Sequence, residues 1–530
     1  MKFFNFKKHA GIRFLHPPTD FLSPRPLGNV VAHNITTNER RRILLDTHIN
    51  DYYWHRRMSC GYQLSTLLAE ISNPGIEKKF LSSDGLVVLN GAAGDRARNA
   101  LKRKANDPAL IANYLKDNWI ELQDPVSVPV SSGFRGECVI EAKNYFNFFH
   151  FMTESLHKVS SLDGIDASID SVRFISKSKE VKPFVESWVR EAGLSNDFPV
   201  SLTEIKPSES FGSSIVTPLS AKHLLYQLSG SHHDAIEATK PAGRTWDGYD
   251  ARPHPVKILA TNSFDDTLYS FRRRMIDLAM RHVERKWSSR IYAIRSSALL
   301  RSRKMEGEED LIVELTKNGF EVVCFENMSP LEQVKCVSGA RCVVMQHGAG
   351  MSNMIFAREN AHFFEIGTYQ TALARWGDFI SLSHVSGCNY HHIFSNMDFA
   401  DDFDPVFARD GLIAPKLDGV SIERIVHIIK SSLSDKRSGI LLGLERHFNY
   451  YVSRRAYRHA FRLLDANASF FDNIGDYWML RGRLNELSSH TESSIDNFYR
   501  AWDLSGSESA WVQFMRLSSE SDPRRKLRNS

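Results

Sequence analysis

A regular alternation of short apolar runs and helical patterns, which begins near residue 135, constrains the fold of this chain more than any other feature. In the first part of this alternation, we expect strands in ECVIEAK and SVRFIS and helices over 147–163, 181–193 and 265–285. This alternation is typical of βαβ units built on a parallel sheet. The sequence therefore predicts an α/β fold.

The alternation restarts at RIYAIRS, residues 290–296. Strands FEVVCF, RCVVMQ and HFFEIG follow, separated by helical patterns over 308–318, 329–338 and 350–358. The connections have the short lengths expected in α/β architecture. Two successive α/β halves predict two Rossmann-like domains that face one another, with the ligand site at the carboxyl ends of their strands.

A chain of 530 residues is too long for one hydrophobic core. We expect residues 1–130 to be an irregular extension packed on the first domain, followed by domains at 131–286 and 287–435. Residues 440–530 read as helix only, with tetratricopeptide-like spacing of Trp478, Gly482, Phe498 and Ala501. This region is either a helical appendage packed on the body or a module that binds a protein partner.

Composition excludes several classes of protein. A net charge of +5 without long basic runs argues against a nucleic-acid partner. The six cysteines form no CxxC pair, which argues against a zinc framework and favours a reducing compartment. Neither a signal-peptide pattern nor an apolar window of about 20 residues is present, so we expect no transmembrane segment and a cytoplasmic location.

The clearest chemical motif is VVMQHGAGMSNMIF, residues 343–356. A β-branched strand runs into His347, Gly348, Ala349 and Gly350, and Asn353 then lies in the first turn of an expected helix. Glycines permit a close backbone approach, and a helix start favours an anion such as a diphosphate. The alternative is a tight turn around a buried histidine.

Two further residues are expected at the same sheet edge. Glu365 ends the strand HFFEIG, where a carboxylate can accept hydrogen bonds from ribose hydroxyls. Arg295 ends RIYAIRS, and its guanidinium suits phosphate oxygens. Arg301 and Arg303, in the loop that follows, are expected to be surface charges.

A second motif, FNFFHFMTESLHKV, covers residues 146–159. On a regular helix, Asn147, His150, Glu154 and His157 fall within a sector of about 80°. The opposite side carries Phe148, Phe149, Met152, Leu156 and Val159. We expect the apolar side to face the core and the polar row to face outward, as a solvated face or as the wall of a reaction site.

The segments NFFHFMTESLHK, IYAIRSSALLRSRKMEGEEDLIVEL, MSPLEQVKCVSGARCVVMQHGAGMSNMIFA and FFEIG resemble, in order and spacing, glycosyltransferase family 61. The resemblance covers roughly residues 135–430. It implies a GT-B fold and inverting transfer from a nucleotide sugar as co-substrate, with no metal and no other cofactor. This chain departs from the family pattern at His157-Lys158 and at Gly307-Glu308.

Under this resemblance, residues 131–286 are the acceptor domain and residues 287–435 the nucleotide-sugar domain. Inverting transfer needs a base for the acceptor hydroxyl. His150 is the first candidate, Glu154 is the alternative, and both could bind the acceptor without taking its proton. Acceptor-binding residues are then Asn147 and His157. Donor-binding residues are Arg295, His347, Gly348, Ala349, Gly350, Asn353 and Glu365.

The resemblance predicts a glycosyltransferase of cell-surface or capsular polysaccharide synthesis. Its partners are a nucleotide sugar, a glycan acceptor and, through residues 440–530, a protein. A peripheral position at the inner face of the membrane is compatible with the expected cytoplasmic location. The alternative function is a non-catalytic nucleotide-sugar-binding or scaffold protein that uses the helical tail for its partners.

Other motifs are interpreted as surface features. Asp402-Phe403-Asp404 matches a metal-binding DxD pattern but lies in an acidic stretch without strand context. The pairs His232-His233 and His391-His392 lack the spacing of metal ligands. No GxSxG or GxGxxG sequence supports a hydrolase or a dinucleotide oxidoreductase.

Overall fold

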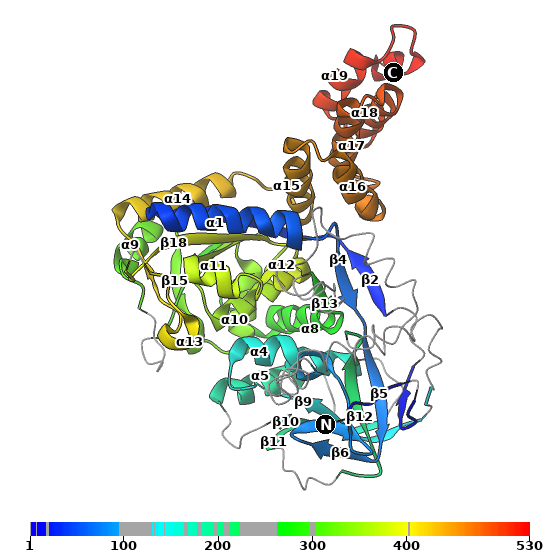
Figure 1. Ribbon diagram of the computed structural model, residues 1–530, viewed down its shortest axis with the longest axis vertical. Coiled ribbons are helices and arrows are strands. Elements are labelled where there is room, and N and C mark those ends of the chain that lie inside the picture. The colour runs from blue at the N-terminus through cyan, green and yellow to red at the C-terminus, as the bar shows by residue number, and fades with distance from the viewer. Residues whose placement is uncertain are drawn as a thin grey trace.

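A computed structural model of the protein describes residues 2–529 except 7, 17–20, 95–129, 132, 143, 164–167, 177–181, 194–198, 205–210, 223–261, 297–303 and 401–402. It shows a mixed α/β body from which a column of helices projects (Figure 1). Arg301, Arg303 and the pair His232-His233 lie outside the described residues.

The first large sheet has six strands in the order β1-β5-β12-β9-β10-β11. Strands β12, β9, β10 and β11 run parallel, whereas β5 is antiparallel to β12 and to β1. The bounds are β1 (Ile12–Phe14), β5 (Thr66–Ser72), β9 (Arg135–Glu141), β10 (Ser168–Ser176), β11 (Val200–Glu204) and β12 (Ser214–Ser220). The strands expected in ECVIEAK and SVRFIS are confirmed as β9 and β10.

The second large sheet has seven strands, in the order β15-β14-β16-β17-β18, with β19 and β3 both paired to β18. All of its pairs are parallel except β18 with β19. The bounds are β3 (Asn29–Asn34), β14 (Arg290–Ile294), β15 (Glu321–Cys324), β16 (Cys342–Gln346), β17 (His362–Thr368), β18 (Asn389–Met397) and β19 (Pro415–Lys416). All the strands expected from residue 290 onward are confirmed.

The first 94 residues differ from the irregular extension expected there. They place β5 in the first sheet and β3 in the second, so the N-terminal segment joins both. They also hold α1 (Glu39–Asp51) and the strands β2 (Leu22–Arg25) and β4 (Gly61–Leu64), which form a small sheet with the later strand β13 (Ser263–Asp265). A further small sheet consists of β6 (Pro74–Glu77), β7 (Phe80–Ser83) and β8 (Leu86–Val87). Strands β3, β4 and β5 pair with segments far along the chain, and local sequence patterns do not record such long-range pairing, whereas β6, β7 and β8 pair locally with one another.

Helices lie between the two large sheets and pack on both. One continuous apolar core contains residues of the first sheet such as Phe174, residues of the second sheet such as Phe363, and the helices between them. Trp188 of α5 stacks on Phe356, with ring centroids 6.0 Å apart. These helices include α5 (Pro183–Gly193), α8 (Thr267–His282), α10 (Pro330–Gly339), α11 (Tyr369–Arg375) and α12 (Ile380–Ser386) (Figure 1).

The outer face of the second sheet has a separate core. There α9 (Glu308–Lys317) and α14 (Gly419–Leu433) bury Leu311 and Ile425 against residues such as Val344. The body also contains the short helix α13 (Phe407–Asp410). Within the described ranges, no helix combines the length and apolar character that a membrane span requires.

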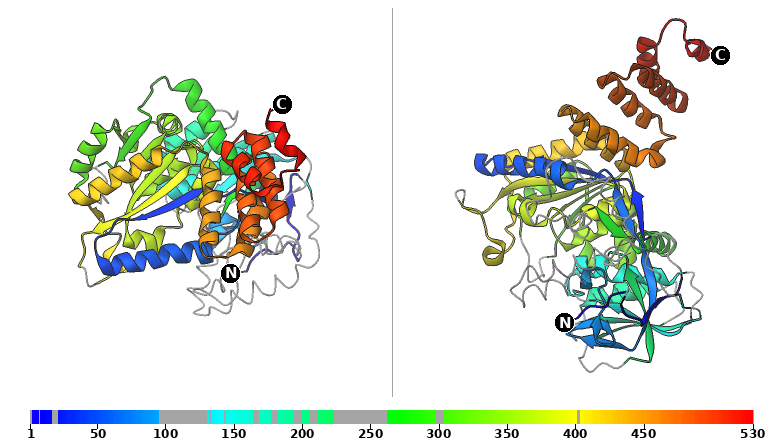
Figure 2. Two further views of the ribbon diagram at one scale, coloured as in Figure 1. Left: turned by 90° about the horizontal axis from the view of Figure 1, so that it is seen from above. Right: turned by 45° about the vertical axis from the view of Figure 1, so that its right-hand side comes forward.

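The C-terminal region is helical, as expected. Its elements are α15 (Gly439–Ser453), α16 (Tyr457–Phe471), α17 (Gly475–Leu487), α18 (Thr491–Ser505), α19 (Glu508–Leu517) and a 3-10 helix (Pro523–Asn529). They extend away from the body in a column that ends at the C-terminus (Figure 2). Within it Gly482 lies under Phe498, whose ring atoms would be 2.7 Å from an added Cβ.

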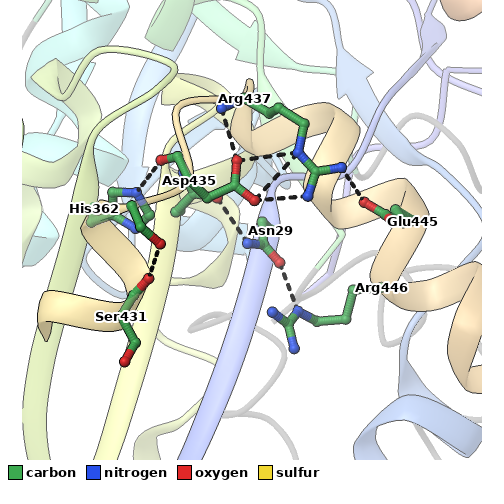
Figure 3. Close-up of polar contacts among 9 residues, drawn as sticks. Asn29, His362, Ser431, Asp435, Arg437, Glu445 and Arg446 are labelled. Atoms are coloured by element: carbon green, nitrogen blue, oxygen red, sulfur yellow. Dashed lines mark hydrogen bonds and ion pairs between the residues drawn. The ribbon is translucent and has the colours of Figure 1, made fainter. Parts of the chain in front are cut away.

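The first helix of this column is anchored to the second sheet. Arg446 of α15 donates to Asn29 at 3.1 Å, and Asn29 donates to Asn389 at 2.8 Å (Figure 3). Just before α15, Arg437 bridges Asp435 and Glu445 at 2.7 and 2.6 Å. Helix α15 therefore packs on the body, and the later helices extend from it.

Candidate active site

The first part of the site is the helix α4 (Phe148–Glu154). Asn147 is its N-cap, with its side chain facing the backbone N–H of His150 at 3.5 Å, and Phe151 and Met152 are buried. His150 Nδ1 lies 2.6 Å from Glu154 Oε1 across one helical turn. An ionised carboxylate only accepts, so Nδ1 carries the hydrogen and Nε2 keeps its lone pair.

The polar row does not continue past this helix. At Ser155 the backbone leaves the α conformation (φ −133°, ψ −57°), and a 3-10 helix over Leu156–Leu162 follows. Three residues per turn rotate His157 off the row. His157 is fully buried, its Nδ1 lies 2.7 Å from Thr267 Oγ1, and burial lowers its pKa to about 3. The prediction that His157 faces outward beside His150 is therefore wrong.

Lys158 is buried, which the sequence did not indicate. Its Nζ donates to Asn90 at 3.1 Å. Burial lowers the pKa of the Lys158 ammonium, and the charges of Asp265, Glu141 and Glu154 oppose that shift. Glu154 is therefore bonded to His150, and its charge is one of three that favour the protonated form of Lys158.

The second part of the site is the turn after β16. His347 continues from Gln346 and donates its backbone N–H to Ile366 at 2.9 Å, which keeps it against β17. Gly348 is fully extended, and a 3-10 helix then spans Ala349–Phe356. The helix expected over 350–358 exists, but as a 3-10 helix. Gly348, Ala349 and Gly350 are partly exposed in it.

Glu365 lies at the centre of a buried polar network. One carboxylate oxygen bonds His347 Nδ1, and the other accepts the hydroxyl hydrogen of Tyr390 and lies 3.6 Å from His392 Nδ1. Burial raises the pKa of Glu365, but His392, His347 and these hydrogen bonds outweigh it and lower the pKa. The residue is therefore an anion with no exposed surface.

This geometry contradicts the expected contact between Glu365 and a ribose. Both of its oxygens are engaged inside the protein, and it is the fourth residue of β17, not the last. It orients His347 instead. Because Nδ1 of His347 faces the carboxylate, Nε2 is the nitrogen left for a ligand.

Asn353 and Arg295 have different surroundings. Asn353 is fully buried and donates to Gln333 at 3.1 Å, while its Oδ1 atom has no hydrogen-bond partner among the described residues, and its role in donor binding stays a prediction. Arg295 follows β14, and its guanidinium carbon would lie 3.5 Å from a Cβ added to Gly348. Among the described residues, Arg295 Nη1 is buried without a hydrogen-bond partner. Arg295 is therefore a cation placed beside the glycine turn.

The two parts of the site meet at Phe379, in the segment between α11 and α12. Its ring centroid lies 5.1 Å from that of Phe149 on α4 and 5.4 Å from that of His347. Helix α4 also contacts the 3-10 helix that follows His347. The tertiary structure thus brings together two histidines separated by nearly 200 residues, each bonded to a glutamate.

Several residues of this site were missed or misread from the sequence. The pair His391-His392 is buried, so its interpretation as surface residues is wrong. His391 bonds His33 and His362 at 3.0 Å each, while His392 lies next to Glu365. On a strand, Tyr390 and His392 share one face, and that period-two pattern could have revealed them. No local pattern in the sequence indicates Phe379.

The described residues contain no group of three or more His, Cys, Asp or Glu side chains that could hold a metal ion. Asp402 lies outside the described part of the chain. Asp404 pairs with both terminal nitrogens of Arg40, at 2.9 and 2.8 Å. Of the two aspartates in the DxD pattern, the structure describes Asp404, and its carboxylate is bound by Arg40.

Helix α4 and the His347 turn both lie in a segment that matches the model of a protein family. A comparison with curated proteins finds no match to the chain. The model of the family described as Glycosyltransferase 61 matches residues 148–364, from the first residue of α4 to the middle of β17. This match confirms the resemblance seen in the sequence and assigns the segment 148–364 to glycosyltransferase family 61.

Proposed function

We propose that this protein is an inverting glycosyltransferase, which moves a sugar from a nucleotide sugar to a hydroxyl of a glycan or other acceptor in cell-surface or capsular polysaccharide synthesis. The observation that carries the proposal is the pair of glutamate–histidine dyads, His150–Glu154 and His347–Glu365, gathered around Phe379. Membership of family 61 supplies the class of reaction.

His150 is the base in this proposal. Glu154 holds Nδ1 at 2.6 Å and orients the ring, so Nε2 can take the proton of the acceptor hydroxyl. The acceptor oxygen then forms a bond to the anomeric carbon while the bond from that carbon to the phosphate oxygen breaks. The electron pair of the broken bond leaves with the diphosphate. Glu154 is then a positioning residue, and Asn147 fixes the start of the helix.

The donor side of the proposal uses the turn after β16. Arg295, whose Nη1 atom is buried without a hydrogen-bond partner in the described part of the chain, supplies positive charge for the departing diphosphate beside Gly348. His347 Nε2, oriented by Glu365, is a donor or acceptor for the nucleotide sugar. The partly exposed backbone of Gly348, Ala349 and Gly350 allows close approach of the phosphates.

We propose a GT-B arrangement with an acceptor unit at 131–286 and a nucleotide-sugar unit at 287–435, supported by the two sheets with parallel strands. Residues 440–530 would form a tetratricopeptide-like region open to a protein partner. The reaction needs no metal in this proposal. A cytoplasmic site of action, at or near the inner face of a membrane, fits synthesis from nucleotide sugars.

Binding and turnover test the proposal separately. Calorimetry against a panel of nucleoside diphosphates should find a ligand, and one present at 100 times its Kd should add about 2.7 kcal/mol of stability. His347→Gln and Glu365→Gln should weaken that binding. His150→Ala should leave it intact but remove donor hydrolysis and transfer, because only the proton acceptor is lost.

His427→Ala, on the exposed surface of α14, is the matched control and should change neither measurement. Unchanged affinity in both donor-side variants would refute the donor site. Wild-type protein that binds nucleotide sugars without ever turning them over would favour the scaffold function. Loss of activity in EDTA with recovery in Mn²⁺ would contradict the metal-independent reaction.

A further inference from the structure

Three histidines on the outer face of the second sheet form a continuous hydrogen-bonded chain. His33 Nε2 lies 3.0 Å from His391 Nδ1, and His391 Nε2 lies 3.0 Å from His362 Nδ1. His362 Nε2 lies 3.3 Å from the backbone carbonyl oxygen of Asp435 (Figure 3). His391 and His362 are buried, and His33 is half-buried. We refer to these three residues as the histidine chain.

The register of two strand pairs brings the three side chains together. On β17, His362 lies opposite Asn389, two residues before His391. On β3, His33 lies opposite Ile393, two residues after His391. Because side chains two residues apart on a strand share a face, the three histidines are diagonal neighbours on one face. Ile393 belongs to the core under α9 and α14, so this is the outer face of the sheet.

The carbonyl of Asp435 sets the direction of every hydrogen bond in the histidine chain. A carbonyl oxygen only accepts, so His362 Nε2 carries a hydrogen and Nδ1 of the neutral ring keeps a lone pair. His391 must therefore donate from Nε2 to His362, which leaves its own Nδ1 as the acceptor for His33. His33 then donates from Nε2. All three rings thus have the same tautomer, with the hydrogen on Nε2.

The surroundings keep the histidine chain neutral. Burial is the largest cause that lowers the pKa of each of its histidines, to about 4 in His33. The other charged or titratable groups that act on the chain come from α15, the segment before β16, β18 and the segment before α15, and they are Arg446, Arg341, His392 and Asp435. The two arginines disfavour a proton on the chain, whereas Asp435 favours one on His362.

Helix α15 is fixed to the same face of the sheet. Arg446 of α15 donates to Asn29 at 3.1 Å (Figure 3). Asn29 lies four residues before His33 on β3, and therefore on the same face. At the other end of the histidine chain, the Asp435 carbonyl belongs to the segment that leads into α15. The attachment of α15 and the histidine chain therefore share one surface.

An added proton can enter the histidine chain at one end without breaking a hydrogen bond. In the part of the protein that the structure describes, His33 Nδ1 has no hydrogen-bond partner, and the other five ring nitrogens are engaged. A proton from water on His33 Nδ1 can be followed by transfer of the Nε2 proton of each ring to Nδ1 of the next. The positive charge then lies near Arg446 or Arg341, and like charges repel.

We propose that the histidine chain makes the attachment of α15 sensitive to acid. While it is neutral, it holds the segment before α15 through the Asp435 carbonyl and leaves Arg446 bound to Asn29. When it takes up a proton, repulsion from the new charge weakens the Arg446 contact and releases α15. The later helices of the column extend from α15 and move with it. The inference does not depend on the proposed transfer reaction.

The tautomers are tested by long-range ¹H–¹⁵N correlation of the histidine rings in the full chain at pH 7. The three signals are assigned through His33→Phe, His391→Phe and His362→Phe. All three rings should be neutral, with the hydrogen on Nε2. Asp435→Ala keeps the backbone carbonyl and should leave the tautomers unchanged. A hydrogen on Nδ1 of any of the three neutral rings would refute the arrangement.

The release of α15 is tested by hydrogen exchange between pH 7 and about pH 4.5, expressed as protection factors, which remove the intrinsic effect of pH. Below pH 6.5, protection over 439–453 should fall by up to about tenfold per pH unit. The fall should exceed that over 342–346 in β16, which reports global unfolding. In His33→Phe, which lacks the free nitrogen, the excess should be lost. His490→Gln, at an exposed histidine of the column, is the matched control.

Arg446→Gln gives a second, independent readout. It removes the charge that repels the protonated chain, so protection over 439–453 should depend less on pH than in the wild type. Equal losses of protection in α15 and β16 as the pH falls would show global unfolding alone and overturn the inference. The same conclusion would follow if the excess loss in His33→Phe equalled that of the wild type.

Discussion

At the scale of single residues, the site depends on how its polar atoms are satisfied. Glu365 has no exposed surface, and Tyr390 and His347 complete its hydrogen bonds. Burying an ion in this way is tolerable only when its lone pairs are matched by donors. The hydrogen bond that satisfies the Glu365 carboxylate also orients the His347 ring. The same contact therefore stabilises the buried charge and sets the direction of the imidazole.

Tyr390→Phe tests this dependence. Losing the hydroxyl leaves one oxygen of the buried Glu365 carboxylate without its donor, which should lower the free energy of unfolding by about 1–3 kcal/mol in urea denaturation. Tyr450→Phe is the control, since its hydroxyl donates to Asn50 at 3.3 Å at an exposed site. Equal losses in the two variants would contradict a special role for the buried network.

At the scale of elements, the type of helix decides which polar side chains of residues 147–163 reach the site. The polar pattern predicts a single helix over 147–163, but the chain changes at Ser155 from an α-helix to a 3-10 helix. The change buries His157 and Lys158 and leaves His150 and Glu154 at the site. The apolar pattern is compatible with either helix type. Packing against the neighbouring elements α5 and α8 decides between them.

The C-terminal helices offer a prediction about helix packing. Gly482→Ala would place a methyl group 2.7 Å from the ring of Phe498 and should separate α17 from α18 at a cost of about 1–3 kcal/mol. Hydrogen exchange over 475–505 should accelerate, while nucleotide binding by the body is retained. Gly419→Ala, with no atom within 4 Å of the added carbon, is the control. Unchanged exchange over 475–505 would contradict the close packing.

At the scale of the whole molecule, several buried histidines are kept neutral. Burial is the main cause that lowers the pKa of His33 to about 4, of His157 to about 3 and of His392 to about 4. The unfolded chain has these groups near their ordinary value of 6.5. Between that value and about 4 the unfolded state therefore binds more protons than the folded state, and stability falls as the pH falls.

We expect the Tm to be steady above pH 7 and to fall progressively from pH 6.5 toward 4. The variant His157→Gln lacks one of these groups. Between pH 4 and 6.5, the slope of its free energy of unfolding against pH should be lower than that of the wild type by up to about 1.4 kcal/mol per pH unit. His282→Gln, at an exposed position, should leave the slope unchanged. A slope in His157→Gln equal to that of the wild type would contradict the prediction.

The sequence by itself determined the elements and the family. Apolar runs and helical periods predicted the strands β9, β10 and β14 to β17 and the helices α5, α8, α9 and α10, because these patterns record which side of an element is buried, but they did not predict β11, β12 or β13. The HGAGMSN turn and the FNFFHF helix identified glycosyltransferase 61. His150 and Glu154 could be paired from the sequence because residues four apart on a helix are neighbours.

Only the tertiary structure decided what surrounds those residues. Strand β3 joins the second sheet from a segment more than 350 residues away from β18, and no local pattern records such a pairing. The burial of His157, Asn353 and Glu365 likewise depends on long-range packing. Phe379 lies against both Phe149 and His347 because the chain folds its segment there. Charge interactions act through space, and a sequence states only the order of the charges along the chain.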